Sequence, residues 1–392
     1  MNRRQPWLAL AAIGAATAAA HIGNNFTTYL VGGLIDRYHF SPSQMGVFAM
    51  SETLAYAAAM FGVAPRAASC SPRRLALAAS TLVVAAQAGS AATSGFALLL
   101  AGRVVAGLGF GLMNSAVNLA AGHQDHPARA ISTGIMLQTL LYALVNIGLP
   151  MMGAAHGVGG MFAALAGLSA VLGLATLRLP DTAAPAAHGQ ARAAPLPRQG
   201  WWVLAAMALF CAGSLAIWPF MERAAHAIGL SAARFGRYQS LATLLSAGGN
   251  ALLALLAGRI VRRWALTAAL LACGLACAGL TTLTLPGAFA AALVVYNVSW
   301  FLAYPLLLGL AYAADPGGRL AVMTTATWLL AESAAAMGAG TIAQTAGSYT
   351  IIGPLGLAGC VGALLLAWPL ASRADAGQRR LAPPSGQCRQ DG

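Results

Sequence analysis

Charge is scarce in this sequence, and that scarcity excludes most classes of protein. Of the 392 residues 8% are charged and 59% are hydrophobic, whereas an average soluble domain carries about 25% charged residues. A disordered chain, a fibrous protein and an ordinary soluble enzyme do not fit that balance. The six cysteines form no Cys-x-x-Cys pair and no disulfide framework, so they indicate little about the redox compartment.

Lysine is absent. All 22 basic residues are arginines, and the formal net charge is +13. A strongly basic protein can bind nucleic acid. Here, however, the arginines lie in short segments between long apolar runs, as is typical of a polytopic membrane protein that faces anionic lipid. We therefore expect membrane lipid, and not nucleic acid, as a partner.

Twelve apolar runs are long enough to cross a bilayer, which needs about 20 residues per helix. The first follows two arginines, as a signal peptide would, but it is too long for one and eleven further runs follow. The sequence predicts an all-α polytopic membrane protein with 12 transmembrane helices, over residues 7–33, 42–64, 73–94, 98–121, 129–151, 157–178, 201–221, 232–257, 264–285, 288–313, 319–346 and 349–371.

The distribution of arginine predicts the orientation. With the N-terminus inside, seventeen arginines fall in cytoplasmic segments, four in outer loops, and Arg103 inside a span. This bias places both termini in the cytoplasm. The short loops favour a multi-pass protein of a bacterial inner membrane.

One long polar interruption, rich in proline and alanine, divides the chain in the middle. We expect a six-helix bundle at 1–178, a cytoplasmic linker at 179–200, a second six-helix bundle at 201–372, and a disordered cytoplasmic tail at 373–392.

Three short matches indicate an internal repeat. Phe40–Gly46 matches Leu230–Gly236 at an offset of 190, Asp125-x-x-x-Arg129 matches Asp315-x-x-x-Arg319 at 190, and Gly62-x-x-x-Arg66 matches Gly258-x-x-x-Arg262 at 196. All three fall at equivalent places in the two sets of six spans. The sequence therefore predicts two pseudo-symmetric halves, which can rock about a site between them and so give alternating access.

This architecture resembles the major facilitator superfamily of secondary transporters over essentially the whole chain. The loop motif that the family has after span 2 is similar around Gly62, but Arg66 stands where the family has an aspartate, and Arg73 and Arg74 come late. In the family that aspartate belongs to a charge network that locks one conformation. Asp125 and Asp315 are candidates to replace it. The predicted gating residues are Gly62, Arg66, Asp125, Arg129, Gly258, Arg262, Asp315 and Arg319.

The fourth span resembles the family's Arg-x-x-x-Gly-x-Gly pattern, through Arg103, Gly107 and Gly109. The resemblance implies a role in coupling for Arg103. The Gly-Leu-Gly-Phe-Gly run at 107–111 follows no strand, so we interpret it as close helix packing and not as a nucleotide-binding loop. The antiporter motif of span 5 is only hinted at by residues 148–153, so export does not follow from it.

Ionisable groups inside a bilayer are functional candidates by default, because each costs about 2.5–3.5 kcal/mol on insertion scales. Four lie well inside the predicted spans: His21, Glu52, Arg103 and Glu332. Glu332 and Glu52 lie near mid-depth, where a carboxyl group can take a proton from one side and release it to the other. Arg103 can pair with Glu52 or bind an anionic substrate. His21 can relay protons or simply pack.

Polar and aromatic residues recur at helical spacing on spans 1, 5, 8 and 10, which line the cavity in the resembled family. Each stripe alone is also compatible with interhelical hydrogen bonding. The predicted substrate-binding residues are Asn25, Gln138, Tyr142, Asn146, Gln239, Thr243, Tyr296, Trp300, Tyr304 and Trp328.

The sequence thus predicts a secondary active transporter, proton-coupled and monomeric, that moves a small organic molecule. No cofactor, metal site or enzymatic activity is expected, since the chain lacks a P-loop motif and a nucleophile–base set. Uptake of an organic anion, which Arg103 favours, and efflux of an amphipathic compound, which the aromatic face on span 10 suits, remain open. A transporter-like membrane sensor without turnover is the alternative from another class.

Overall fold

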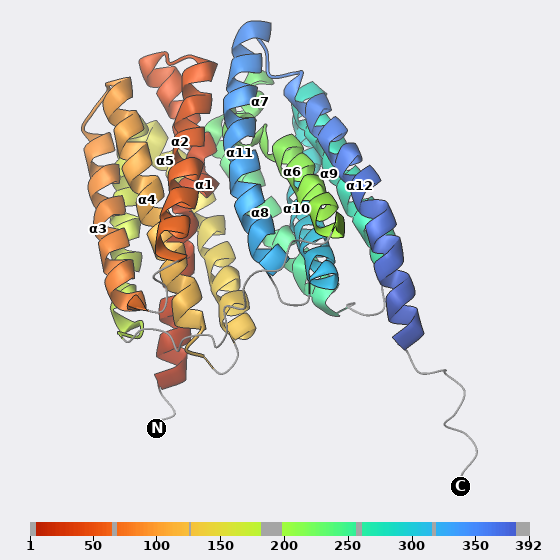
Figure 1. Cartoon of the computed structure of the whole chain (residues 1–392). Helices are drawn as coiled ribbons and strands as arrows, with labels where there is room; N and C mark the ends of the chain where they lie inside the picture. The colour runs from red at the N-terminus through yellow and green to blue at the C-terminus, as the bar shows by residue number, and fades with distance from the viewer. Residues whose placement is uncertain are drawn as a thin grey trace.

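The computed structural model describes residues 5–64, 69–124, 127–181, 198–255, 261–315 and 319–381, and every regular element in these ranges is a helix (Figure 1). The elements are α1 (Gln5–Tyr38), α2 (Pro42–Val63), α3 (Pro72–Ala91), α4 (Phe96–Ala121), α5 (Pro127–Ala175), the short 3-10 helix η2 (Thr176–Arg178), α6 (Arg198–Leu215), the 3-10 helix η3 (Trp218–Phe220), α7 (Met221–Ala227), α8 (Ala232–Leu255), α9 (Arg262–Thr282), α10 (Pro286–Ala314), α11 (Arg319–Ala346) and α12 (Ile352–Leu381).

Helix starts follow from local sequence. The hydroxyl of Ser41 accepts from the backbone N–H of Gln44 at 3.2 Å, and the Gln44 side chain accepts from the backbone N–H of Ser41 at 2.9 Å. This capping box, with Pro42 in the first helical turn, fixes the start of α2. Ser71 caps α3 in a similar way.

Eight helices in the described ranges are long and apolar enough to cross a membrane by length and composition. The three other long helices, α1, α8 and α11, all carry polar residues of the predicted site. The chain is accordingly a multi-pass membrane protein, and its described ranges are helical apart from short connections.

Three boundaries differ from the predicted ones. Spans five and six lie within the single element α5. This element breaks at Gly157, whose φ of 67° is a conformation that glycine adopts without strain. The seventh span ends early, because α6 stops at Leu215 and a Trp-Pro-Phe turn, η3, leads into α7. The residues from 373 onward, predicted as a disordered tail, are helical as far as Leu381.

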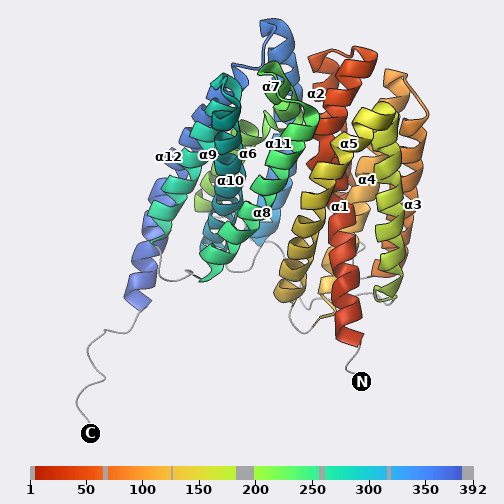
Figure 2. The same cartoon turned by 180° about the vertical axis from the view of Figure 1, so that it is seen from behind.

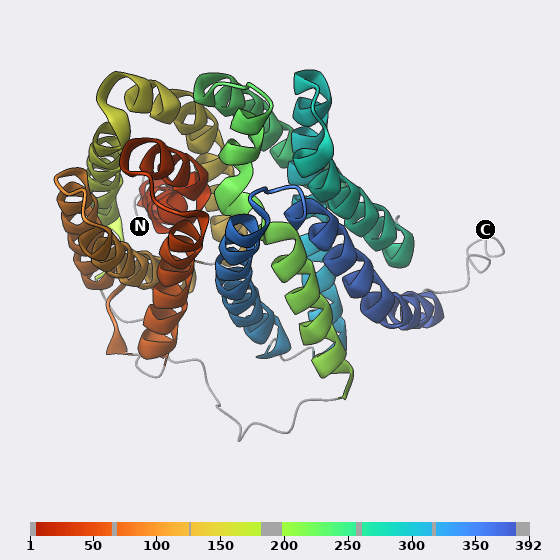
Figure 3. The same ribbon diagram turned by 90° about the horizontal axis from the view of Figure 1, so that it is seen from above.

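The helices form two groups (Figures 1 and 2). Helices α1–α5 pack on one another, and so do α6 and α8–α12. We term these the N-terminal and C-terminal groups. They meet mainly through α2 with α11 and through α5 with α8, on opposite sides of the molecule, as the view from above in Figure 3 also shows.

The two groups touch over the half of the molecule that runs from the middle of the helices to one end, which we term the contact end. Helix α1 begins and helix α12 ends at the opposite end of the molecule (Figure 1). A Cβ on Gly46 of α2 would lie 2.6 Å from the carbonyl oxygen of Ala336 and 3.2 Å from the Cα of Gly340. On the other side, a Cβ on Gly236 of α8 would overlap the carbonyl oxygen of Asn146. Glycine therefore permits both close helix crossings.

Glycines also set the packing inside the N-terminal group. A Cβ on Gly107 or Gly111 of α4 would overlap the backbone carbonyl oxygens of Glu52 and Tyr56 on α2, and one on Gly109 would lie 2.6 Å from Val83 on α3. The interpretation of residues 107–111 as close helix packing is confirmed. The same close approach brings the side chains of Glu52 and Arg103 within reach of each other.

Candidate functional site

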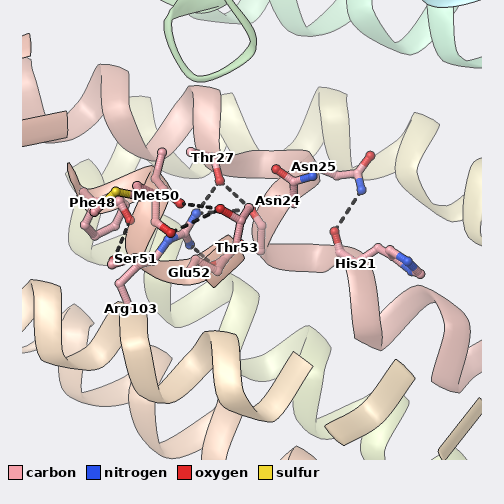
Figure 4. Close-up of polar contacts among 12 residues, drawn as sticks. His21, Asn24, Asn25, Thr27, Phe48, Met50, Ser51, Glu52, Thr53 and Arg103 are labelled. Atoms are coloured by element: carbon pink, nitrogen blue, oxygen red, sulfur yellow. Dashed lines mark hydrogen bonds and ion pairs between the residues drawn. The ribbon is translucent and has the colours of Figure 1, made fainter. Parts of the chain in front are cut away.

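An ion pair lies buried in the N-terminal group. Glu52 Oε2 on α2 is 2.7 Å from Arg103 Nη1 on α4, and the two side chains are only 1% and 2% exposed. Arg103 Nη2 also donates to the hydroxyl of Thr27 and, at 3.4 Å, to the carbonyl oxygen of Gly23, both on α1 (Figure 4). The guanidinium lies 4.6 Å from the ring centroid of Phe48. Arg103 therefore ties three helices together.

Glycine at position 23 makes room for this pair. A Cβ there would overlap the Glu52 carboxylate and the ring of Phe110. The pair is thus enclosed by α1, α2 and α4, and its charges balance.

A second acid lies across the boundary between the groups. Glu332 of α11 is 3% exposed. Ser333, the next residue, contacts Thr53 of α2 with 2.6 Å between the hydroxyl oxygens, and Thr53 in turn follows Glu52. Each acid is therefore followed by a hydroxyl residue, and the two hydroxyls meet where the groups touch.

Glu332 has no basic partner among the described residues. Its polar neighbours are the side chains of Asn24 on α1 and Trp328, one turn earlier on α11. Neither Glu332 Oε2 nor the indole Nε1 of Trp328 has a hydrogen-bond partner within the described part of the chain. The two acids thus share a region but differ in charge compensation.

Aromatic rings gather next to Glu332. The rings of Trp300 and Tyr304 on α10 stack with centroids 5.5 Å apart and planes at 6°. Trp328 lies 6.2 Å from Trp300 and 5.7 Å from Tyr304. All three are partly exposed. We term these three residues the aromatic cluster.

The ring of His21 connects α1 with α2. Its Nδ1 lies 2.9 Å from the carbonyl oxygen of Thr17, so Nδ1 donates, and the Nε2 of a neutral ring is left to accept from the hydroxyl of Tyr56 at 3.4 Å. Figure 4 shows His21 and Asn25 set apart from the ion pair. Asn25 donates within its own helix to the His21 carbonyl oxygen at 2.9 Å.

Several predicted substrate-binding residues hold helices together. Tyr142 donates to the Ala18 carbonyl oxygen at 2.5 Å, and Asn146 donates to the hydroxyl of Thr243 at 3.3 Å, joining α5 to α8. Gln239 donates to Asn297 at 3.1 Å, and Tyr296 donates to the Ser214 carbonyl oxygen at 2.9 Å. Gln138 is partly exposed on α5. A role of these residues in substrate binding stays a prediction.

The predicted gating residues are only partly covered. Arg66, Asp125 and Gly258 lie outside the described residues, and the side chains of Arg129 and Arg319 do as well. A Cβ on Gly62 would meet nothing within 4 Å. Asp315 accepts from the backbone N–H of Leu320 at 2.9 Å, near the start of α11.

Two acids that sequence reasoning passed over contact the arginine pairs. Asp181, after η2, accepts from Ser71 at 2.9 Å and lies 3.7 and 3.4 Å from Arg73 and Arg74. The hydrogen bond from Ser71 and the two arginines lower the pKa of Asp181. In the C-terminal group, Asp375 of α12 accepts from the backbone N–H groups of Arg262 and Arg263 at 3.2 and 3.1 Å.

A further charged cluster links α1 to α7 at the contact end. Arg223 of α7 makes a bidentate contact with Asp36 of α1 at 2.6 and 2.9 Å and contacts Glu222 at 2.8 Å. The backbone N–H of Glu222 donates to Thr28 at 2.8 Å. Adjacent acid and arginine residues near the ends of the first and seventh spans were the signal in the sequence.

Long apolar helices packed in two groups around buried charges are typical of membrane transporters. The family model of the Major Facilitator Superfamily matches residues 11–340, and the chain belongs to that superfamily. Membership identifies it as a transporter and not an enzyme. No curated protein matches the sequence significantly.

Solved transporters share the fold. A peptide transporter, POT, superposes with a TM-score of 0.76 at 15% identity, covering 96% of both chains. The nucleoside transporter NupG gives 0.74 at 13% identity, covering 93% of this chain and 99% of its own. A D-xylose–proton symporter gives 0.72 at 13% identity, covering 92% and 97%. At such identities the likeness concerns the fold.

Proposed function

We propose that this transporter is a proton-coupled secondary carrier of a small organic molecule in the inner membrane, working by alternating access. The observation that supports it best is Glu332, a buried acid without a basic partner among the described residues, at the boundary between the helix groups. An ionised carboxylate there is costly, whereas a proton removes the charge.

Protonation of Glu332 then biases the conformational equilibrium, since a ligand shifts an equilibrium by its difference in affinity for the two states. A membrane potential of 100 mV adds about 2.3 kcal/mol per charge moved. Glu52 differs, because Arg103 already compensates its charge at 2.7 Å. We assign the moving proton to Glu332 and a fixed role to the pair.

The moving bodies in this proposal are residues 1–178 and 201–372, and each crosses the membrane six times. In the first body α5 supplies two of the six crossings. They touch at the contact end in this conformer. With both termini in the cytoplasm, as the arginine bias indicates, this conformer faces inward, and the outward-facing one needs the α2–α11 and α5–α8 contacts to open.

The test is transport by the purified protein in liposomes that enclose a pH-sensitive dye. Small organic compounds are screened for those that move protons, and a compound found in this way is then radiolabelled. We expect Glu332→Gln to abolish accumulation driven by a pH gradient and to retain exchange of labelled for unlabelled compound at concentrations high enough to saturate the variant. Trp264→Leu, which removes an exposed tryptophan outside the site, serves as the control.

Full pH-driven accumulation by Glu332→Gln would remove Glu332 from coupling. If no compound moves across the membrane with the folded wild-type protein, although compounds bind, the chain is a sensor without turnover.

A further inference from the structure

The charged groups near the middle of the helices differ in what they leave available to a ligand. Arg103 is 2% exposed and is engaged by Glu52, Thr27 and Gly23. An anionic substrate would have to displace Glu52 from a bond of 2.7 Å and leave that carboxylate buried and unpaired, which is strongly unfavourable. The ion pair therefore disfavours an organic anion.

Glu332 has the opposite properties. It is nine-tenths buried, its Oε2 lacks a hydrogen-bond partner within the described chain, and no cation there lies within ion-pair distance. A buried polar atom is normally hydrogen-bonded, so an unsatisfied carboxylate oxygen marks a place for a ligand. The side chains of Asn24 and Trp328 beside it are neutral, so they leave the charge of an ionised Glu332 uncompensated.

The aromatic cluster supplies what a cation needs next to a carboxylate. Tryptophan is the best partner for a cation over its ring face, and tyrosine is next. Trp300 is held in place, because its Nε1 donates to the hydroxyl of Ser214 at 3.2 Å and Phe210 stacks on it at 5.9 Å. The rings of the cluster are partly exposed, so an aromatic group of a substrate can contact them.

We propose that the substrate is an organic cation with an aromatic ring, bound by the Glu332 carboxylate and the cluster of Trp300, Tyr304 and Trp328. This inference rests on the proposed transport function and names its substrate class. The cation and the proton exclude each other: when the O–H bond of protonated Glu332 breaks, the proton leaves and the positive group takes its place. The charge of the site is then neutral in both states, which makes the cycle an exchange of cation for proton.

Among the described residues, few other titratable groups lie near Glu332 to take part in the competition between proton and cation. The titratable groups that interact with it are Glu52 and Tyr56 on α2, Cys211 on α6 and Tyr296 on α10. Of these, Glu52 is paired with Arg103, and tyrosine and cysteine are neutral near pH 7 when unperturbed. Glu332 is thus the group that a proton and a cation compete for.

The experiment uses two pairs of probes that differ in the sign of their charge: tetraphenylphosphonium with tetraphenylborate, and benzyltrimethylammonium with benzenesulfonate. Dissociation constants for the purified protein are obtained from thermal shifts at pH 6 and pH 8, because a ligand that binds the folded state raises its stability. We expect both cations, and neither anion, to stabilise the wild-type protein, with tighter cation binding at pH 8.

The variants locate the effect. We expect Glu332→Gln to weaken cation binding by about 30-fold or more, as loss of one partner of a desolvated charge pair does. Trp300→Leu should weaken it by about 3- to 30-fold, and Trp300→Phe by less, since Phe keeps a ring face. The matched controls are Asp181→Asn and Trp264→Leu, which remove an exposed acid and an exposed tryptophan elsewhere. Both should bind like the wild type.

Three results would overturn the proposal: binding of the anions, cation binding that Glu332→Gln leaves unchanged, or no stabilisation of the folded wild type by either cation. If Glu332→Gln does not fold, the comparison of Trp300→Phe with Trp300→Leu and the pH dependence of cation binding decide.

Transport measurements separate this inference from the proposed function. Cations that bind as expected but move no protons leave this inference standing and contradict the proposed function, whereas anions that move protons do the reverse.

Discussion

The two places where the helix groups meet share a backbone arrangement and differ in chemistry. At α2–α11 and at α5–α8, a glycine of one helix packs against the backbone of the other. The equivalent positions lie 190 residues apart, which pairs Gly46 with Gly236, Asn146 with Ala336, and Pro150 with Gly340. The offset is the one that the sequence match between Phe40–Gly46 and Leu230–Gly236 gives.

A hydroxyl group is repeated as well, but the acids are not. Thr53 and Thr243, again 190 apart, each contact the opposite helix, at Ser333 and at Asn146. Glu52 and Glu332, however, correspond to Ala242 and Tyr142. Packing that occurs at both interfaces serves the fold, and charge that occurs at only one points to function. The α2–α11 side is therefore where we place proton and cation.

The largest effect should come from breaking the ion pair on that side. Glu52→Gln leaves the guanidinium of Arg103 buried without a counter-charge, and arginine cannot give up its proton. We expect a loss of about 3–5 kcal/mol in unfolding free energy, measured by denaturation in detergent micelles.

Arg103→Met should cost less, because the remaining carboxyl group can take a proton, and the double variant less than Glu52→Gln alone. Tyr142→Phe on α5, at the position equivalent to Glu332, loses one neutral hydrogen bond to α1 and should lower stability by only about 0.5–1.5 kcal/mol. An equal loss from Glu52→Gln and Tyr142→Phe would contradict the contrast between the charged α2 position and its neutral counterpart on α5.

The glycine contacts should give intermediate effects, and alike on both sides. Gly340→Val and Gly236→Val overpack the closed crossings by about 1–3 kcal/mol and so favour the conformer in which that crossing is open. Spin labels on Ser43→Cys and Gln344→Cys, whose parent residues are hydrogen-bonded across α2–α11 at 3.2 Å, should move apart in Gly340→Val.

Gly338→Val and Gly248→Val are the matched controls on the same two helices, because a Cβ at either glycine meets nothing within 4 Å. An unchanged distance between the labels in Gly340→Val, or an equal change in Gly338→Val, would show that close packing at position 340 does not hold the contact end together.

Sequence reasoning found the helices and the charges buried near the middle of the spans, because both depend on local composition. A run of about 20 apolar residues suffices to span a bilayer, and an acid within such a run is conspicuous. It left open whether Arg103 pairs with Glu52 or takes a substrate. That choice depends on how closely α2 and α4 approach each other. Gly107 permits the close approach that brings Arg103 to Glu52, and this is visible only in the folded structure.

The partners of the arginine pairs were harder to predict. Asp125 and Asp315 were the candidates, and Asp125 lies outside the described residues. Asp181 and Asp375, which were not considered, reach the starts of α3 and α9 from the distant ends of η2 and α12. These contacts depend on how distant helices pack, so no spacing along the chain predicts them. The repeat was the usable signal, since each group has two adjacent arginines at a helix start and an aspartate after its last span.

The smallest effects should come from the repeated hydroxyls, and they sharpen the comparison most. Double-mutant cycles on Thr53→Val with Ser333→Ala, and on Thr243→Val with Asn146→Leu, should both give coupling energies of about 0.6 kcal/mol, up to about 1.7, as interhelical hydrogen bonds in membranes do. Their effects on binding should differ. Only the first pair adjoins the acids, so only Thr53→Val and Ser333→Ala should change the dissociation constant of tetraphenylphosphonium and its dependence on pH. An equal change from Thr243→Val would mean that the α5–α8 interface shares the coupling, and that the duplicated arrangement carries function on both sides.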